Sequence, residues 1–307
     1  MNPRNRVLAP FLVLLAIAAS AGAQQVINFP NFCNTSAFTL NGVTATLNPN
    51  AQCVLRLTSS TGQSGSAFLT NTFSLAADAS FSTFFSFQIL NPVGIGDSDG
   101  AGADGIVFTV QTVSNTAGGG GGGIGYSGIS PSVGVELDTF NNGTQDQNSG
   151  NHIGIDVNGS TTSVALTPIA GRFNDGAVWF VWVDYNGVTD VLEARVSNTA
   201  SRPANPNVST TVNLPVILGT TNAFVGFTSG TGAGGGTHEI LSWNLVGAFA
   251  PVGTTPTPGP TLTPTAPVAT STPVPAPPSP AVPTLSFPML ALLGIALAGA
   301  ALFLMKR

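Results

Sequence analysis

Basic side chains are scarce in the long middle part of this chain. The full chain has 307 residues, 7% of them charged, and a formal net charge of −5. Residues 24–250 contain no lysine, and their basic side chains are limited to Arg56, Arg172, Arg195 and Arg202. Proteins that bind nucleic acids or anionic lipids use clustered Lys and Arg. We therefore expect this part of the chain to bind neither.

Cysteine is also rare. The chain has two cysteines, Cys33 and Cys53, and neither lies in a CxxC pair or near a histidine. This context argues against a metal-binding or catalytic thiol. Two such cysteines in an exported protein most often form a structural disulfide. We predict a Cys33–Cys53 disulfide near the N-terminus of the mature chain.

Apolar residues spaced for an amphipathic helix are missing as well. The apolar residues instead alternate with a period of two, in short runs separated by Gly-, Asn- and Ser-rich turns. The sets expected on one face are Phe81, Phe85, Phe87 and Ile89; Ile106, Phe108 and Val110; Val133, Val135 and Leu137; and Ile153, Ile155 and Val157. Residues 179–183 (WFVWV) are apolar on both faces, which predicts a strand buried inside the fold. The predicted fold class is all-β, with two packed antiparallel sheets.

The first 23 residues have the features of a signal peptide. Arg4 and Arg6 precede an apolar run at 7–19 and a small-residue pattern at 21–23. This order is typical of secretory signals, and the apolar run is too short for a stable membrane span. We expect the mature chain to begin at Gln24 and to fold as one large domain over residues 24–250.

Two further segments follow that domain. Residues 251–283 are rich in Pro and Thr, and such a segment favours an extended, disordered stalk because it has little apolar surface to bury. Residues 285–305 carry no charge and would extend about 30 Å as a helix, which is enough to cross a bilayer. Lys306 and Arg307 follow and are expected to stay in the cytoplasm. Residues 284–307 therefore predict one transmembrane helix with a basic end.

Residues 136–152 concentrate side chains that can hold metal ions. If Val135 and Leu137 point into the core, Glu136 and Asp138 point to the opposite face. Two neighbouring carboxylates repel each other, and a bound cation resolves that repulsion. The polar residues that follow are Asn142, Asp146 and His152. The oxygen ligands suit calcium and the imidazole suits a transition metal.

Several motifs are ordered along the chain in a way that resembles the legume-type (L-type) lectins. They are QSGSAF (63–68), ADGIVFTVQ (103–111), GGIGY (122–126), ELDTFNN (136–142), NHIGIDVNG (151–159) and VGFTSGTGAGGGTHEILSWNL (225–245). The resemblance covers most of residues 24–250. It implies a concanavalin A-like jelly-roll β-sandwich that binds carbohydrate.

The resemblance also implies two metal sites. Calcium would be held by Asp138, the Phe140 carbonyl, Asn142 and Asp146. A second site, for manganese or a similar transition metal, would use Glu136, Asp138, Asp146 and His152, with Ser163 acting through water. The family places its second Asp five residues before the His, whereas Gln147 occupies that place here and Asp146 lies one residue earlier. A one-residue insertion in the loop would accommodate this shift.

The same resemblance implies how a sugar is held. Its hydroxyls would bond to the Asp104 carboxylate, the Gly122 amide and the Asn142 side chain, with the Phe140 ring stacked against it. The Ala103–Asp104 peptide bond would be cis. The fourth loop of the site, TGAGGGTHE (231–239), carries Ala233 and Gly234 where relatives have larger contact residues. These two small residues predict an open and shallow site.

The C-terminal tail is similar to the IPTL-type sorting signals of Gram-negative bacteria. Residues 282–307 read VPTLSFPMLALLGIALAGAALFLMKR, with Val282 in place of the usual Ile. In that family a sortase-like membrane protease processes the tail. The tail therefore predicts a sorting protease as a partner. We expect an exported protein at a cell surface or outer envelope, anchored at least transiently in the membrane by its C-terminal helix.

Three functions are compatible with these features. A calcium-dependent lectin that binds glycans is the expected one. A glycoside hydrolase of the same fold would carry E-x-D-x-x-E, but Asn141 stands five residues after Glu136, so a second catalytic carboxylate is missing. We therefore expect no enzyme activity. The shifted Asp146 and the small fourth loop favour the third function, a structural or adhesive surface domain without sugar binding.

An acidic run at residues 97–105 (DSDGAGADG) invites comparison with calcium-binding loops. An EF-hand loop needs a bidentate glutamate at its twelfth position. Counted from Asp97, that position is Phe108. The run is therefore not expected to form an EF-hand.

Overall fold

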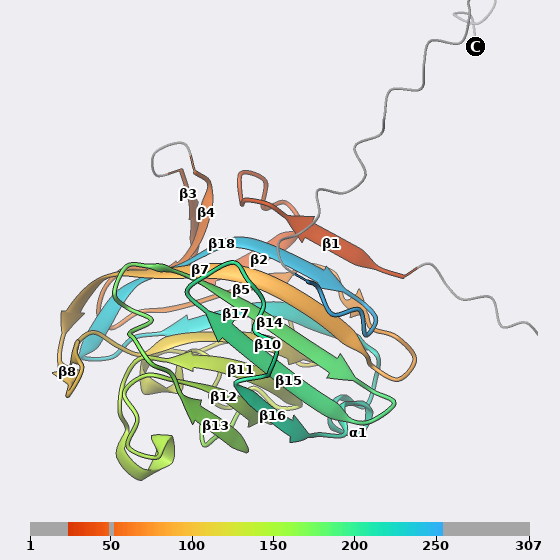
Figure 1. The fold of residues 1–307 in the computed structure, drawn as a ribbon. Coiled ribbons are helices and arrows are strands. Elements are labelled where there is room, and N and C mark those ends of the chain that lie inside the picture. The colour runs from red at the N-terminus through yellow and green to blue at the C-terminus, as the bar shows by residue number, and fades with distance from the viewer. Residues whose placement is uncertain (1–23, 49–51, 254–307) are drawn as a thin grey trace, which may run out of the picture. The chain divides into compact units, whose positions relative to one another are not determined.

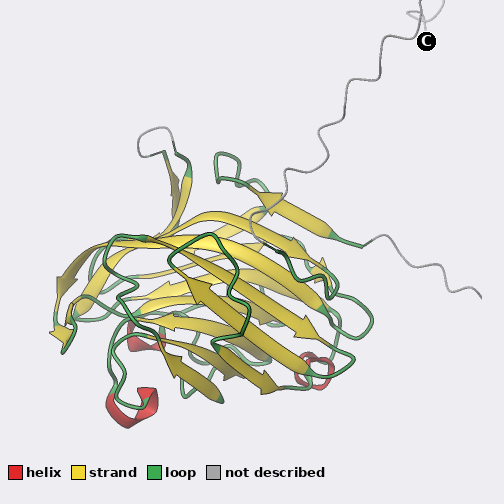
Figure 2. Ribbon diagram, in the orientation of Figure 1, coloured by secondary structure: helices red, strands yellow, loops and turns green. Residues whose placement is uncertain are grey.

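Strands dominate the part of the chain that the computed structural model describes, residues 24–48 and 52–253 (Figure 1, Figure 2). They form two eight-stranded antiparallel sheets that pack against each other. Sheet A has the strand order β16-β15-β14-β7-β18-β4-β3, and β1 also pairs with β18. Sheet B has the order β13-β12-β11-β10-β17-β5-β2, and β6 also pairs with β17. The predicted all-β sandwich of two antiparallel sheets is confirmed.

The strands have the following bounds. Sheet A contains β1 (Val26–Phe29), β3 (Ala45–Leu47), β4 (Val54–Thr58), β7 (Phe81–Gly94), β14 (Val178–Asn186), β15 (Val191–Ser197), β16 (Val208–Thr211) and β18 (Gly234–Val246). Sheet B contains β2 (Phe38–Gly42), β5 (Ser64–Leu69), β6 (Phe73–Ser74), β10 (Gly105–Gln111), β11 (Ser132–Asp138), β12 (His152–Val157), β13 (Ala165–Pro168) and β17 (Asn222–Gly230). A separate hairpin consists of β8 (Gly96–Asp97) and β9 (Gly100–Ala101).

Aromatic rings fill the core between the sheets. Phe85 of β7 and Phe227 of β17 have ring centroids 5.0 Å apart, and Trp243 of β18 lies 5.1 Å from Phe227. The residues predicted to share one face of each strand all contribute to this core, with Val157 partly buried at its edge. Because alternate residues of a strand point to opposite faces, the remaining residues of sheet B point outward. That outer face carries the candidate site.

Strand β14 contains the segment that is apolar on both faces. Trp179, Val181 and Val183 pack into the core. Trp182 is fully buried on the opposite face, with its ring centroid 5.2 Å from that of Phe84. The prediction of a strand buried on both sides is confirmed.

Helical structure among the described residues is limited to short segments. The α-helix α1 (Leu214–Leu218) has five residues, and the 3₁₀ helices η2 (Gly121–Gly123) and η3 (Gly143–Asp146) are shorter still. The Asn213 side chain caps α1 by accepting a 3.0 Å hydrogen bond from the Val216 amide. Five residues are too few to display a helical period, which is why the apolar pattern does not indicate α1.

Several predicted segments fall outside the described residues. These are the signal peptide at 1–23, residues 254–283 of the Pro/Thr-rich stalk, and the membrane helix and sorting signal at 284–307. Within the described ranges, no helix is long and apolar enough to cross a membrane.

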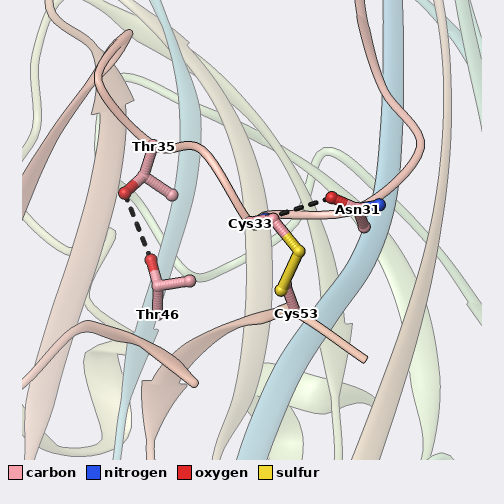
Figure 3. The surroundings of a disulfide bond; sticks show 5 residues. All are labelled: Asn31, Cys33, Thr35, Thr46 and Cys53. Atoms are coloured by element: carbon pink, nitrogen blue, oxygen red, sulfur yellow. Dashed lines mark hydrogen bonds between the residues drawn. A yellow bond between two sulfur atoms is a disulfide. The ribbon is translucent and has the colours of Figure 1, made fainter. Parts of the chain in front are cut away.

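The disulfide closes a break between two strands that share one neighbour. Strand β1 pairs with Trp243–Val246 of β18, and β4 pairs with His238–Ile240 of the same strand. Cys33 follows β1 and Cys53 directly precedes β4, and the two are joined as predicted (Figure 3). The Phe32 amide also donates a 2.9 Å hydrogen bond to the Cys53 carbonyl. The bond therefore holds two separate strands in line along β18.

Removing this disulfide should lower stability without altering the candidate site. The two cysteines are 20 residues apart, and a loop of that size stabilises a fold by about 3 kcal/mol through the entropy of the unfolded chain. We expect a Cys33→Ala/Cys53→Ala variant to lose about this much free energy of unfolding in urea titrations. As a control, the variant should be as stable as the wild-type chain whose disulfide has been reduced. A variant as stable as the oxidised chain would contradict the prediction.

His238 of β18 is a fully buried imidazole between the sheets. Its Nδ1 lies 2.7 Å from the Thr58 hydroxyl, and its Nε2 has no partner among the described residues. Burial disfavours the charged form and lowers the pKa of His238 from 6.5 to about 4. The folded chain therefore keeps this histidine neutral at pH values where the unfolded chain protonates it.

The chain should consequently lose stability in mild acid because of His238. The unfolded state takes up the proton as pH falls below 6.5, and the folded state takes it up only near 4, so stability is lost between these values. The full loss from this group is about 3 kcal/mol. We expect His238→Gln to have a correspondingly smaller difference in unfolding free energy between pH 7 and pH 4, measured by urea titration with chelator present. Equal differences in both proteins would contradict this prediction.

Candidate metal and carbohydrate site

Strands β11 and β12 present Glu136, Asp138 and His152, three of the predicted metal ligands, on the outer face of sheet B. Val135 and Leu137 of β11 lie in the core, so Glu136 and Asp138 point outward as the alternation predicts. The antiparallel register places Asp138 opposite His152 at the start of β12. Residues that are 14 positions apart in the sequence thus become neighbours across one strand pair.

Glu136, Asp138 and His152 form a compact cluster of ligand atoms. One ligand atom from each lies within 4.8 Å of the others, and His152 Nε2 is 3.1 Å from Glu136 Oε1. All three residues are buried. Glu136 Oε2 and His152 Nδ1 are buried polar atoms without a partner among the described residues. Buried polar atoms are normally satisfied, so this arrangement fits a metal ion.

Electrostatics in the cluster favour a positive charge. Burial, together with the negative charge of Glu136, raises the pKa of Asp138 well above its usual range. The Asp138 Oδ1 atom accepts a 2.7 Å hydrogen bond from the Phe140 amide, which opposes that rise. A divalent cation would favour the ionised carboxylates and remove the repulsion between them.

The loop between β11 and β12 places Asp146 inside and Gln147 outside. Asp146 ends the 3₁₀ helix η3 and is 1% exposed, and its carboxylate accepts a hydrogen bond from the Asn142 amide. Gln147 is exposed and has a left-handed backbone with φ 54°. Asp146 therefore stands where it can face His152, although it is one residue early in the family pattern.

Asp156 of β12 is a fifth acidic or basic group at this site and is not among the residues predicted from the sequence. It is fully buried, and burial together with Glu136 raises its pKa well above its usual range. The Ser163 hydroxyl bridges the two acids, 2.8 Å from Asp156 Oδ1 and in hydrogen-bond contact with Glu136 Oε1. Alternation along β12 does indicate Asp156, because it lies four residues after His152 and therefore on the same face of the strand.

Among the predicted sugar-binding residues, Asp104 is the one that the other groups of the site surround. The Ala103–Asp104 peptide bond is cis, as the resemblance predicts. The Asp104 carbonyl accepts a 2.9 Å hydrogen bond from the Thr139 amide, which joins it to the end of β11. Asp104 is 5% exposed, and burial raises its pKa to about 6, while the Gly232 backbone amide opposes this rise.

Two glycine loops approach Asp104 closely. A Cβ atom placed on Gly122 would lie 3.8 Å from Asp104 Oδ1 and 3.9 Å from Asn142 Nδ2. A Cβ on Gly232 would lie 3.8 Å from Asp104 Oδ2. The structure therefore brings Asp104, Gly122 and Asn142 together. Gly232 also belongs to this group and is not among the predicted residues, because nothing local distinguishes it from the other glycines of segment 230–236.

Tyr126 holds the first glycine loop on the sheet. Its ring is fully buried and lies over Gly134 of β11, where a Cβ atom would be 3.0 Å from the ring. The Tyr126 hydroxyl is 2.8 Å from the Ser132 hydroxyl. Ile124 and Val107 complete this small apolar cluster beneath the loop. The first glycine loop, residues 118–123, is thus anchored at its C-terminal end.

The remaining predicted sugar contacts occupy different positions. Phe140 is partly exposed beside the metal cluster, and Ala233 is exposed in the fourth loop. Gly234 is buried in β18, where a Cβ atom would lie 2.8 Å from the Ala103 Cβ. It supports the Asp104 segment from behind, and Gly232 faces the carboxylate.

Comparisons with known proteins agree with this geometry. A family model described as legume lectin domain matches residues 24–255. Lectin DB58 from Vigna unguiculata subsp. cylindrica is 33% identical over 263 residues, covering 78% of this chain and 88% of the relative. The structure of winged bean acidic lectin complexed with methyl-alpha-D-galactose has a TM-score of 0.60 at 27% identity, covering 73% of this chain and 98% of that chain.

Some relatives are much longer than this chain. The L-type lectin-domain containing receptor kinase VIII.1 from Arabidopsis thaliana is 31% identical over 178 residues. That alignment covers 55% of this chain and 24% of the relative. The similarity to such proteins is therefore confined to one part of them.

Because Gly154 of β12 has no side chain, the predicted metal ligands Glu136 and Ser163 have room beside it. A Cβ atom there would be 2.2 Å from the Ser163 hydroxyl oxygen and 2.4 Å from Glu136 Oε1. We expect Gly154→Ala to displace the Glu136 carboxylate and to weaken Mn²⁺ binding by at least about tenfold in calorimetric titrations. Gly119→Ala is the matched control, because a Cβ there meets no atom within 4 Å. Equal affinities in both variants would contradict the prediction.

Proposed function

Because the chain belongs to the legume lectin domain family, whose members bind carbohydrate, we propose that it is a calcium-dependent glycan-binding protein displayed at a bacterial cell surface. One observation carries this proposal. Asp104, Gly122 and Asn142 come from separate loops and converge beside a buried cluster of carboxylates and an imidazole. These three residues would recognise the sugar.

The three residues offer complementary hydrogen-bonding groups. A sugar hydroxyl is both a donor and an acceptor. The Asp104 carboxylate would accept from it, and the Gly122 amide and the Asn142 side-chain amide would donate to it. The Phe140 ring, partly exposed next to Asn142, would stack on the apolar face of the sugar ring. The fourth loop would add little contact area, because its exposed residue is Ala233.

The metal ions would order the loop that carries Asn142. Calcium would be held by Asp138, the Phe140 carbonyl, Asn142 and Asp146. A manganese-like ion would be held by Glu136, Asp138, Asp146 and His152, with Ser163 contributing through water. Fixing these groups in advance lowers the entropy lost when a ligand binds.

The same side chains are unsuited to hydrolysis. Retaining glycosidases place two carboxylates on either side of the scissile bond. Glu136 and Asp138 are buried against His152, and Asn141 occupies the position where such enzymes of this sandwich carry a second acid. The chain belongs to a family of carbohydrate-binding domains that are not enzymes.

Display at a cell surface rests on the ends of the sequence. Residues 1–23 would direct export, residues 251–283 would act as a stalk, and residues 284–307 would anchor the chain in a membrane until a sorting protease acts on it. In this proposal the glycan-binding domain would lie outside the cytoplasm of a Gram-negative cell.

A glycan array tests the proposed activity. We expect the purified chain to bind a subset of glycans in calcium, to release them in chelator and to cleave none. Asp104→Asn should reduce binding at least about tenfold, because the amide cannot supply both acceptors of a carboxylate.

Asp78→Asn is the charge-matched control for that variant, since Asp78 lies before the start of the long strand β7, whose other end approaches the site. Binding that survives both chelator and Asp104→Asn would contradict the proposed site. Absence of binding to every glycan would support a structural or adhesive surface domain instead.

A further inference from the structure

The hairpin of β8 and β9 connects the loops around Asp104. In Figure 1, β8 lies at the end of the sandwich opposite α1. The Ile95 amide donates to the Ala233 carbonyl at 3.2 Å, and the Ile95 carbonyl accepts from the Gly102 amide at 3.1 Å. Gly102 is two residues before Asp104, and Ala233 follows Gly232. The hairpin is therefore attached by its backbone to both segments that border the Asp104 carboxylate.

Asp97 extends from this hairpin into the metal-binding loop, residues 139–151. Its Oδ2 atom accepts a 2.8 Å hydrogen bond from the Asn141 amide. Its Oδ1 atom accepts a 3.0 Å hydrogen bond from the Asp99 amide, which fixes the carboxylate on its own hairpin. Asp97 thus joins the hairpin to the residue directly before Asn142.

Because Gly150 has no side chain, the Asp97 carboxylate has room beside the C-terminal arm of the loop. A Cβ atom on Gly150 would lie 2.3 Å from Asp97 Oδ2. The carboxylate consequently lies against one arm of the loop at Gly150 while it is bonded to the other at Asn141. No other side chain of the described hairpin residues makes a hydrogen bond to this loop.

Asp99 lies beside Asp97 and also contacts Arg172. Its carboxylate lies 3.5 Å from Arg172 Nε, and Arg172 Nη2 donates a 2.9 Å hydrogen bond to the Ala101 carbonyl. Arg172 therefore anchors the outer side of the hairpin through Asp99 and Ala101. Asp97 contacts the loop, Asp99 contacts Arg172, and the two acids of the DSDG run also interact with each other.

We propose that Asp97 is a positioning residue, which holds Asn141 so that the Asn142 side chain faces Asp104 and Gly122 before any ion or sugar binds. This inference rests on the proposed glycan-binding function. The Asn142 side chain is exposed and makes no hydrogen bond to the described residues, so its position depends on the backbone that carries it. The hydrogen bond from Asp97 fixes that backbone from outside the loop.

Two variants break this contact in different ways. Asp97→Ala removes the acceptor. Gly150→Ala keeps the acceptor and its charge but fills its place, and the atom that must move is the end of a flexible side chain, so the backbone need not shift. Asp97→Asn retains one oxygen acceptor and is the conservative variant. Asp175→Ala is the control, because it removes an exposed carboxylate that accepts a hydrogen bond from the Ala177 amide and contacts neither Asp97 nor the loop.

Amide hydrogen exchange on the chelator-treated full chain is the primary measurement. We expect Asp97→Ala and Gly150→Ala to speed exchange in residues 139–150 by about tenfold, the effect of one lost hydrogen bond to a charged group. Asp97→Asn should restore slow exchange in part, and Asp175→Ala should leave this segment unchanged. Calcium titration should show weaker binding in the first two variants only.

These outcomes separate the positioning role from the proposed function. Unchanged exchange at 139–150 in Asp97→Ala, or equal changes in Asp97→Ala and Asp175→Ala, would overturn the role of Asp97 whether or not the chain binds glycans. Faster exchange in a chain that binds no glycan on the array would support the role of Asp97 and contradict the glycan-binding function.

Discussion

The site depends on acidic side chains buried where little positive charge is available. Glu136, Asp138 and Asp156 are almost fully buried on the outer face of sheet B, and His152 is the imidazole beside them. Carboxylates in such surroundings repel one another, and this repulsion together with burial raises the pKa of Asp138 and Asp156. A cation held by these oxygens relieves the repulsion. Any ion that binds only the folded chain therefore also stabilises the fold.

Glycines next to the acids make this burial geometrically possible. Gly154 is paired with Glu136 across β11 and β12, and its missing side chain leaves room for the carboxylate to lie flat on the sheet. Gly134, two residues before Glu136, leaves room for the Tyr126 ring. The two-residue period that directs the acids outward thus also directs glycines outward, so one strand pattern supplies both the charges and the space for them.

How much of the site could be predicted from sequence depends on how local each signal is. Alternation within β11 placed Glu136 and Asp138 on the outer face, and the same rule in β12 could have identified Asp156. The proximity of Asp104 and Gly232 depends on the pairing of β10 with β17, more than 100 residues apart, which periodicity does not reveal. Only the family resemblance indicates Asp104. No local pattern indicates the role of Asp97, because that role depends on where the hairpin of β8 and β9 packs against the loop.

Asp146 and Gln147 take opposite orientations in the loop between β11 and β12. Asp146 closes the turn by accepting from the Asn142 amide, and Gln147 takes a left-handed backbone and points to solvent. The loop between β11 and β12 contains no strand, so contacts such as this one and that of Asp97 with Asn141 order it. Because two carboxylates already hold the backbone, an arriving ion has little loop entropy to overcome. Its binding free energy can then act mainly on the repulsion among the buried acids.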